Sequence, residues 1–193
     1  MKVLHIDTSA RSKGSVTRDL SQMVVSRLEE NDISQTKKRD LGTGATIPFI
    51  NEDWLQQKVD ALSWSEELIG EVEWADALVI GLPIYNFSVP AVFKAWFDQI
   101  AIAQRTFHYV EGWPVGLLKN RPCWIVIASD GVEVSSDYDH AMPWIRTSLN
   151  MIGLKDLHFI IADQLLIDET RINQAIATIA NSNFCSTEAQ NHI

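Results

Sequence analysis

Short apolar runs alternate along the chain with longer segments in which apolar residues recur at helical spacing. The clearest run covers residues 77–82. It is too short for a helix and rich in aliphatic residues, as is typical of a strand buried on both faces of a parallel sheet. Pro83 ends the run because it has no N–H for a strand ladder. After a short exposed turn at residues 84–87, a helix is predicted at about residues 90–100, with Ser88 as its N-terminal cap.

The rest of the chain repeats this rhythm. Four further strands are predicted at residues 3–6, 35–41, 122–128 and 157–162, the second of them polar enough for a sheet edge. Four further helices are predicted at residues 15–30, 54–75, 141–151 and 169–181. The first of these helices carries Leu20, Met23, Val24 and Leu28 on one face, and the third ends at Gly153, a typical C-terminal cap. Residues after 182 are predicted to be loosely held.

Residues 106–121 interrupt this alternation. They mix aromatic with polar residues and turn near residues 111–114, which predicts a small hairpin or an excursion outside the main pattern, and not a helix. The five strand–helix units predict a single α/β domain over residues 1–193. The expected architecture is a flavodoxin-like three-layer sandwich, with a five-stranded parallel sheet of order 2-1-3-4-5.

In such a sheet, ligands bind at the loops that follow strands 1, 3 and 4. These loops are residues 8–14, 83–87 and 129–132. The first loop leads into a helix N-terminus and is dense in hydroxyl donors, an arrangement that favours a phosphate group; its polar residues are Ser9, Arg11, Ser12, Ser15 and Thr17. It matches neither G-x-x-x-x-G-K-[ST] nor G-x-G-x-x-G, which argues against a nucleoside triphosphate or a Rossmann dinucleotide site.

The other two loops offer groups that suit a flat ring. Asn86 has both a donor and an acceptor for a heteroaromatic edge, and residues 129–132 can direct backbone N–H groups at a ring oxygen. Each loop also has a purely structural interpretation, with Ser15 as a helix cap and Tyr85 and Phe87 as packing residues. Taken together, the three loops predict a monophosphate joined to a planar ring, which means FMN.

Composition narrows the possible partners. The formal net charge of −9 argues against nucleic acid, since no basic patch is available to displace counterions. Cys123 and Cys185 have neither metal-site nor disulfide-framework spacing, which favours a reducing compartment. No signal peptide is recognised and no apolar run approaches the about 20 residues of a membrane span. These features predict a cytoplasmic protein without a membrane partner.

Several segments resemble one enzyme family. The run P-I-Y-N-F-S-V-P followed by F-K-A-W-F-D is similar to a segment of the FMN-dependent NADH azoreductases, also called FMN-dependent NADH:quinone oxidoreductases. The segments D-T-S-A-R-S-K-G-S, T-F-H-Y-V-E-G-W-P-V-G-L-L-K-N-R and I-G-L-K-D-L-H-F-I-I-A-D-Q-L resemble that family's phosphate loop, aromatic segment and last strand. The similarity covers nearly the whole chain.

With this resemblance, the residues expected to bind FMN are Ser9, Arg11, Ser15, Val16, Thr17, Pro83, Ile84, Tyr85, Asn86, Phe87, Ser129, Asp130, Gly131 and Val132. Residues 9 and 15–17 would hold the phosphate, and residues 84–87 and 129–132 the isoalloxazine. The sequence departs from the family pattern in two places. Ile84 replaces a methionine, and Asp130-Gly131-Val132 replaces a variable residue and two glycines. Val132 does not suit a positive φ, and a carboxylate at 130 would disfavour an anionic reduced flavin.

The resemblance also implies the activity. Two electrons would pass from NADH or NADPH to quinones or azo compounds by ping-pong hydride transfer, with the flavin and no dedicated catalytic residue or metal carrying the chemistry. His140 is a candidate proton donor to a quinone oxygen. The expected substrate pocket includes Phe107, Tyr109 and Trp113. Relatives are homodimers with the flavin at the subunit interface, and residues 107–113 are the candidate segment for reaching the partner's site.

Two other functions stay open at this point. A flavodoxin-type one-electron carrier would fit the acidic composition and predicts a stable blue semiquinone with negligible NADH turnover. A flavodoxin-like module that has lost its flavin would fit the changes at Asp130 and Val132. It predicts a protein that stays colourless after FMN is added.

Overall fold

A five-stranded parallel sheet forms the centre of the computed structural model, which describes residues 1–30, 35–44 and 47–182. The strand order is β2-β1-β3-β6-β7. The strands are β1 (Lys2–Asp7), β2 (Gln35–Asp40), β3 (Ala77–Pro83), β6 (Pro122–Ala128) and β7 (Asp156–Ala162). With the two hairpin strands β4 and β5 set aside, this order is the predicted 2-1-3-4-5, so the flavodoxin-like fold is confirmed.

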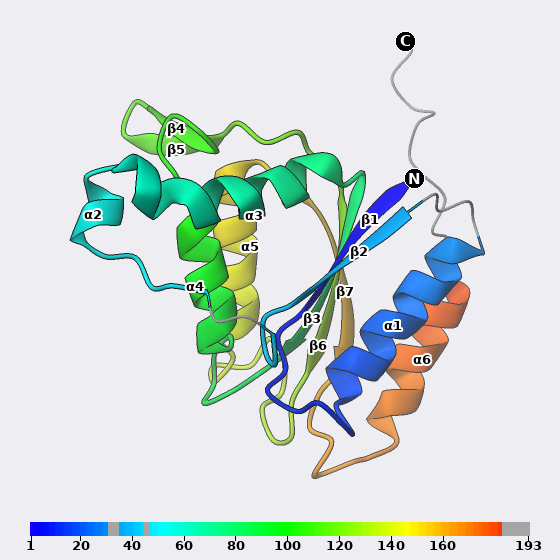
Figure 1. Ribbon diagram of the computed structural model, residues 1–193. Coiled ribbons are helices and arrows are strands. Elements are labelled where there is room, and N and C mark those ends of the chain that lie inside the picture. Colours follow the sequence, from blue (N-terminus) through cyan, green and yellow to red (C-terminus); the bar gives the residue numbers. More distant parts are fainter. Residues whose placement is uncertain (31–34, 45–46, 183–193) are drawn as a thin grey trace.

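Helices cover both faces of the sheet, as Figure 1 shows. On one face lie α1 (Val16–Glu29) and α6 (Arg171–Asn181); on the other lie α3 (Ser63–Trp74), α4 (Ala91–Ile100) and α5 (Ala141–Ile152). The central strands β3 and β6 are buried almost throughout, which explains their unbroken apolar sequence, whereas the edge strand β2 exposes most of its side chains. No helix in the described ranges is long and apolar enough to cross a bilayer.

The expected helix over residues 54–75 is wrong in its first half. The structure has a short helix α2 (Glu52–Leu55), a 3-10 turn η1 (Val59–Leu62) and then α3. Asn51 caps α2 by accepting a hydrogen bond from the Trp54 N–H, and Gln57 adopts a left-handed conformation with a φ of 54° that ends it. Apolar spacing alone did not reveal this break, because the interruption depends on a polar residue's backbone.

Two smaller expectations are also corrected. Ser88 does not cap α4; its backbone N–H and C=O instead pair with Tyr85, and Pro90 occupies the cap position without a side-chain bond. Met23 is 37% exposed rather than buried with the apolar face of α1. The Gly153 cap of α5 is confirmed by its φ of 107°. The prediction for residues after 182 falls outside the described residues.

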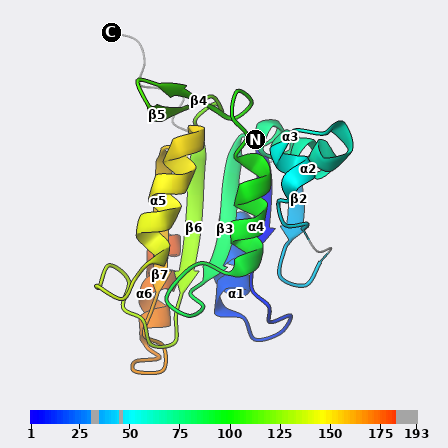
Figure 2. The same ribbon diagram turned by 90° about the vertical axis from the view of Figure 1, so that its left-hand side faces the viewer.

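The predicted hairpin is present. It consists of β4 (Phe107–Val110) and β5 (Trp113–Gly116), which pair antiparallel around Glu111 and Gly112, both at positive φ. The segment after it is tied to the C-terminal end of α5, because the Leu118 N–H donates to the Ile152 carbonyl. Figures 1 and 2 both place the hairpin at the end of the sheet opposite to the loops that follow β1, β3 and β6.

Candidate functional site

The loops that follow β1, β3 and β6 converge at one end of the sheet, the lower end in Figures 1 and 2. Two adjoining cavities lie among them and share Ile84, Ser129 and Asp130. The narrower is lined by Ser9, Arg11, Ser15, Val16, Thr17, Pro83, Ile84, Tyr85, Ala128, Ser129, Asp130 and Leu165. The wider, of about 760 Å³, is lined by Ile84, Asn86, Phe87, Ser129, Asp130, Gly131, Val132, Glu133, Ser136, Asp137, Tyr138 and Gln164.

All fourteen residues that sequence reasoning selected for a cofactor line one or both cavities. They come from three segments that are far apart in the chain, so their convergence is a property of the fold and not of sequence proximity. The wider cavity has the volume typical of small-molecule sites, roughly 300–1,000 Å³. The two cavities adjoin at their shared residues, and together we call them the crevice at the strand ends.

The first loop has the chemistry of an anion site. Ser15 caps α1 and accepts a hydrogen bond from the Arg18 N–H. The hydroxyls of Ser9, Ser15 and Thr17 line the narrow cavity although these residues are at most 5% exposed. Within the described part of the chain, the N–H groups of Val16 and Thr17 have no acceptor. Free N–H groups at the positive end of a 14-residue helix, beside buried hydroxyls, suit a phosphate.

The packing of α1 on the sheet fixes where these groups point. A Cβ on Gly81 of β3 would lie 3.0 Å from the Ser21 hydroxyl oxygen and 3.0 Å from the Thr17 carbonyl oxygen. A side chain at residue 81 would push α1 away by a few tenths of an ångström, so glycine favours this close approach. Thr8 adds a second tie, because its N–H and its hydroxyl both donate to the Gly81 carbonyl, at 3.1 and 2.8 Å.

The second loop is a two-residue turn between Tyr85 and Ser88. These two residues exchange backbone hydrogen bonds of 3.0 and 3.1 Å, and Asn86 and Phe87 between them have φ values of 48° and 69°. Two consecutive left-handed residues are typical of a type I′ turn, and neither is glycine here. The turn projects Asn86 and Phe87 into the wall of the wider cavity. Its Phe87 carbonyl accepts a hydrogen bond from the His140 N–H at 3.0 Å.

Tyr85 joins the first two loops. Its hydroxyl oxygen accepts a hydrogen bond from the Ala10 N–H at 3.2 Å and lies 3.4 Å from the Ser9 hydroxyl oxygen. Phe87 instead faces Tyr138, with ring centroids 6.1 Å apart. The second loop thus contributes one aromatic residue to each cavity.

The third loop is held by the side chain of Ser129. The Ser129 hydroxyl donates to the Val132 carbonyl and accepts from the Gln164 N–H. Neither Gly131 nor Val132 has a positive φ, so the valine in place of the family's second glycine is compatible with the loop. The Asp130 carboxylate lies 4.0 Å from the Arg11 guanidinium across the crevice, and both side chains are mostly exposed.

Two buried carboxylates that sequence reasoning missed shape the same loop. Asp139 accepts hydrogen bonds from the N–H groups of Ser135, Ala141 and Met142. Asp163 accepts from the Val134 N–H at 2.7 Å and pairs with Arg171. Asp139 did carry a signal, since an aspartate just before an apolar helical segment is a typical N-terminal cap. Asp163 follows the last strand and carried no local signal for a partner 29 residues away.

The hairpin residues do not reach the crevice within one chain. Phe107 is buried against Tyr109, with ring centroids 5.5 Å apart, and Tyr109 and Trp113 are 63% and 76% exposed at the far end of the sheet. Their place in a substrate pocket stays a prediction, and it requires a second copy of the chain. His140 is tied to the second loop through its backbone but lines neither cavity.

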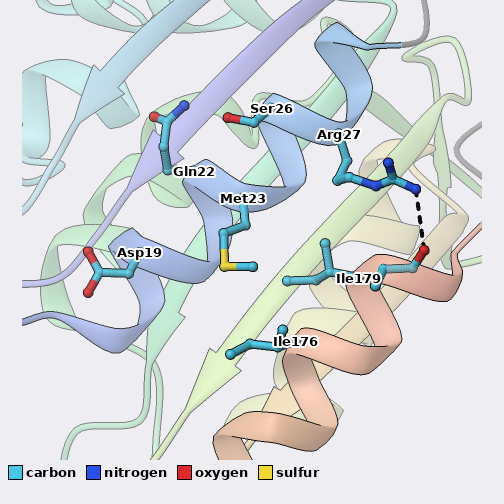
Figure 3. Close-up of a pocket in the computed structure, with 8 residues that line it drawn as sticks. Asp19, Gln22, Met23, Ser26, Arg27, Ile176 and Ile179 are labelled. Atoms are coloured by element: carbon cyan, nitrogen blue, oxygen red, sulfur yellow. Dashed lines mark hydrogen bonds between the residues drawn. The ribbon is translucent and has the colours of Figure 1, made fainter.

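A separate groove of about 530 Å³ lies between α1 and α6. Figure 3 shows Met23 of α1 beside Ile176 and Ile179 of α6 around this groove, with Arg27 donating to a backbone carbonyl of α6. Its remaining lining residues are Asp19, Gln22, Ser26 and Ala180. The groove offers an apolar floor without a converging set of donors, in contrast to the crevice at the strand ends.

Residues 1–182 match the model of a family described as having the flavodoxin-like fold. The chain is 42% identical over 187 residues to FMN-dependent NADH:quinone oxidoreductase 1 of Jannaschia sp. (strain CCS1), covering 91% of this chain and 95% of the relative. It is 40% identical over 183 residues to the protein of the same name from Hahella chejuensis (strain KCTC 2396), covering 89% of each.

Solved structures share the fold at lower sequence identity. The azoreductase from Bacillus anthracis str. Sterne superposes with a TM-score of 0.83 at 19% identity, over 93% of this chain and 97% of that one. The FMN-dependent NADH-azoreductase from Bacillus anthracis str. Ames Ancestor, solved in complex with FMN, gives a TM-score of 0.81 at 22% identity, over 92% and 95%.

Proposed function

The chain belongs to the flavodoxin-like family of FMN-dependent NADH:quinone oxidoreductases, and from this membership we propose that it binds FMN in the strand-end crevice and reduces quinones with NADH. The observation that carries the proposal is the convergence of all fourteen predicted cofactor residues on two adjoining cavities. The narrower cavity has the N–H and hydroxyl groups that suit a phosphate, and the wider cavity has the volume and the polar residues that suit a flat ring. FMN is a cofactor with both parts.

The residues present fit that cofactor. The Val16 and Thr17 N–H groups lack acceptors in the described residues, and the buried Ser15 hydroxyl lies on the neighbouring residue; a phosphate would give both N–H groups an acceptor. At the ring end, Asn86 and Phe87 lie on a turn whose left-handed backbone is held by two hydrogen bonds. Such a preorganised turn can present N–H groups to a ring edge without rearranging.

When bound, FMN would supply two-electron chemistry between NADH and a quinone or an aromatic azo compound, which we propose to follow a ping-pong cycle. The chain's own residues would bind and orient it. Residues 9 and 15–17 would hold the phosphate, and residues 84–87 and 129–132 would hold the ring. Phe87 and Tyr138 form an aromatic wall at the open side of the wider cavity, where a flat acceptor can pack. Binding of the cofactor and of the acceptor does not require a side chain that donates a proton.

We further propose that the active form is a homodimer. The hairpin and the segment after it expose a group of apolar side chains at one end of the molecule: Tyr109, Val110, Trp113, Val115 and Leu117. Exposed apolar groups of this kind mark interaction surfaces. A second copy would cover them and would bring Tyr109 and Trp113 towards a neighbouring crevice.

The free, buried thiol of Cys123 fits the reducing cytoplasm in which we place the protein.

A steady-state assay tests the function. Protein loaded with FMN is mixed with NADH and benzoquinone under anaerobic conditions, and the oxidation of NADH is followed. The assay is repeated with NADPH in place of NADH and with an azo dye in place of benzoquinone. Parallel lines in double-reciprocal plots support the ping-pong cycle. A stable blue semiquinone with negligible NADH oxidation would instead assign a one-electron carrier, and a protein that stays colourless after FMN addition would remove the redox proposal.

A further inference from the structure

Arg18, on the first turn of α1, makes an unusual set of contacts beneath the first loop. Its guanidinium pairs with both carboxylate oxygens of Asp40, at 2.7 and 2.8 Å, and with Asp7 at 3.2 Å. The same guanidinium donates to the backbone carbonyl of Ser9 at 2.7 Å. The Arg18 side chain is only 13% exposed. A planar fork of this kind fixes the geometry of its partners as well as attracting them.

Asp40 extends this connection to the loop after β2. It accepts hydrogen bonds from the N–H groups of Gly42 and Thr43, both at 3.0 Å, and from the Thr43 hydroxyl at 2.6 Å. The loop backbone then runs directly against the first loop, because a Cβ on Gly42 would lie 1.9 Å from the Ser9 carbonyl oxygen. Arg18 and Gly42 thus both lie directly against the Ser9 carbonyl.

Asp7 supplies a second negative charge below the loop. It is fully buried, and Lys38 at 2.8 Å, the Ser21 hydroxyl at 3.2 Å and the His5 imidazole at 3.4 Å all face it. Two carboxylates therefore face two permanent cations, Arg18 and Lys38, so the charge of Arg18 is already balanced within the protein. Arg18 also lines neither cavity of the crevice. It is consequently not placed to serve as a direct phosphate ligand.

We propose that Arg18 is a positioning residue for the phosphate of the cofactor, acting through the Ser9 carbonyl. This inference rests on the proposed binding of FMN. Ser9 accepts the Arg11 N–H at its hydroxyl oxygen, at 3.2 Å, and that hydroxyl lines the narrow cavity. Fixing the Ser9 peptide therefore fixes the Ser9 hydroxyl, and with it the Ala10 N–H that donates to the Tyr85 hydroxyl, at the phosphate end of the crevice. The ring end is built from other loops and does not contact Arg18.

This separation gives a test that uses two flavins. Riboflavin has the ring of FMN but lacks the phosphate, so the ratio of their dissociation constants reports the phosphate end alone. We expect Arg18→Met to weaken FMN binding roughly tenfold or more, as for a lost charge-assisted hydrogen bond. Riboflavin binding should change less than about threefold. Both constants come from quenching of flavin fluorescence by the apoprotein.

Matched variants separate positioning from general stability. Arg27→Met removes a cation from the other end of α1, where Arg27 pairs with Glu30, and should leave both constants unchanged. Arg18→Lys keeps the charge without the fork and should restore FMN binding only in part; it also serves if Arg18→Met does not fold. Equal weakening of both flavins, or an unchanged ratio, would overturn the inference while leaving the FMN proposal intact. Failure of the wild-type protein to bind FMN would overturn both.

Discussion

Phe87 holds a left-handed backbone conformation, with a φ of 69°, at the turn between β3 and α4. For a residue with a Cβ, this conformation costs roughly 1–2 kcal/mol. Glycine adopts it freely, although a glycine also makes the unfolded chain more flexible by about 0.4–1 kcal/mol. The side chain of Phe87 is half exposed, and both Phe87→Gly and Phe87→Ala remove its ring from Tyr138.

Comparing Phe87→Gly with Phe87→Ala isolates the free energy of the left-handed backbone conformation, because both variants lose the same aromatic ring. The balance predicts that Phe87→Gly is more stable than Phe87→Ala by about 0.5–1 kcal/mol. Leu166 is a suitable control, since it is 81% exposed and does not have a positive φ. At that position alanine should be the more stable variant by roughly 0.5–1 kcal/mol.

Urea unfolding of the apoprotein, followed by circular dichroism, measures all four free energies of unfolding without a contribution from bound flavin. The two positions should show differences of opposite sign. Both Phe87 variants should also raise the KM for a quinone, because the aromatic wall of the wider cavity is lost. If alanine is favoured equally at residues 87 and 166, the backbone strain that we assign to the turn is absent.

Further predictions concern the groups around the site. Asp139→Ala should lower the free energy of unfolding by about 2 kcal/mol in a urea titration, because three N–H groups, two of them buried, lose their acceptor. Burial alone would raise the pKa of Asp40, but hydrogen bonds from Arg18 and Thr43 outweigh it and hold the pKa below its usual 3.8. Its carboxylate therefore adds stability above about pH 4 that is lost as the pH falls, and Asp40→Asn should flatten the acid side of a stability–pH curve. Burial raises the pKa of the Cys123 thiol to about 12, so peptide mapping after iodoacetamide treatment of the native protein should find it unmodified. Trp113→Ser should shift the protein towards monomer in sedimentation and lower quinone turnover together; unchanged sedimentation would remove the hairpin from the interface.

Local chemistry made much of the fold predictable, and it also suggested the phosphate end of the proposed site. The run at residues 77–82 required a buried strand, and Ser15 before an apolar helical segment required a helix start with free N–H groups. The break at Gln57 escaped prediction because it depends on a left-handed backbone angle that residue type does not announce.

The supporting residues of the site were beyond sequence reasoning for a different reason. The sequence around Arg18 does not distinguish it from a solvated residue on a helix. Its positioning role depends on Ser9, Asp7 and Asp40, which the fold brings to it. Asp163 likewise acts on a loop 29 residues away. Such tertiary partners leave no spacing in the sequence, whereas the loops that face the cavity do follow from the strand order.

Titration of the apoprotein with FMN, for the wild type beside Thr17→Val, Asn86→Gly and Ser129→Ala, tests most directly whether the three loops hold one flavin. Thr17 lies in the first turn of α1, just after the loop that follows β1, and Asn86 and Ser129 lie in the loops after β3 and β6. The wild type should bind one FMN per chain, and each variant should bind it more weakly at the same stoichiometry. A wild type that binds no FMN would contradict a single shared site. So would a result in which only one of the three substitutions weakens FMN binding.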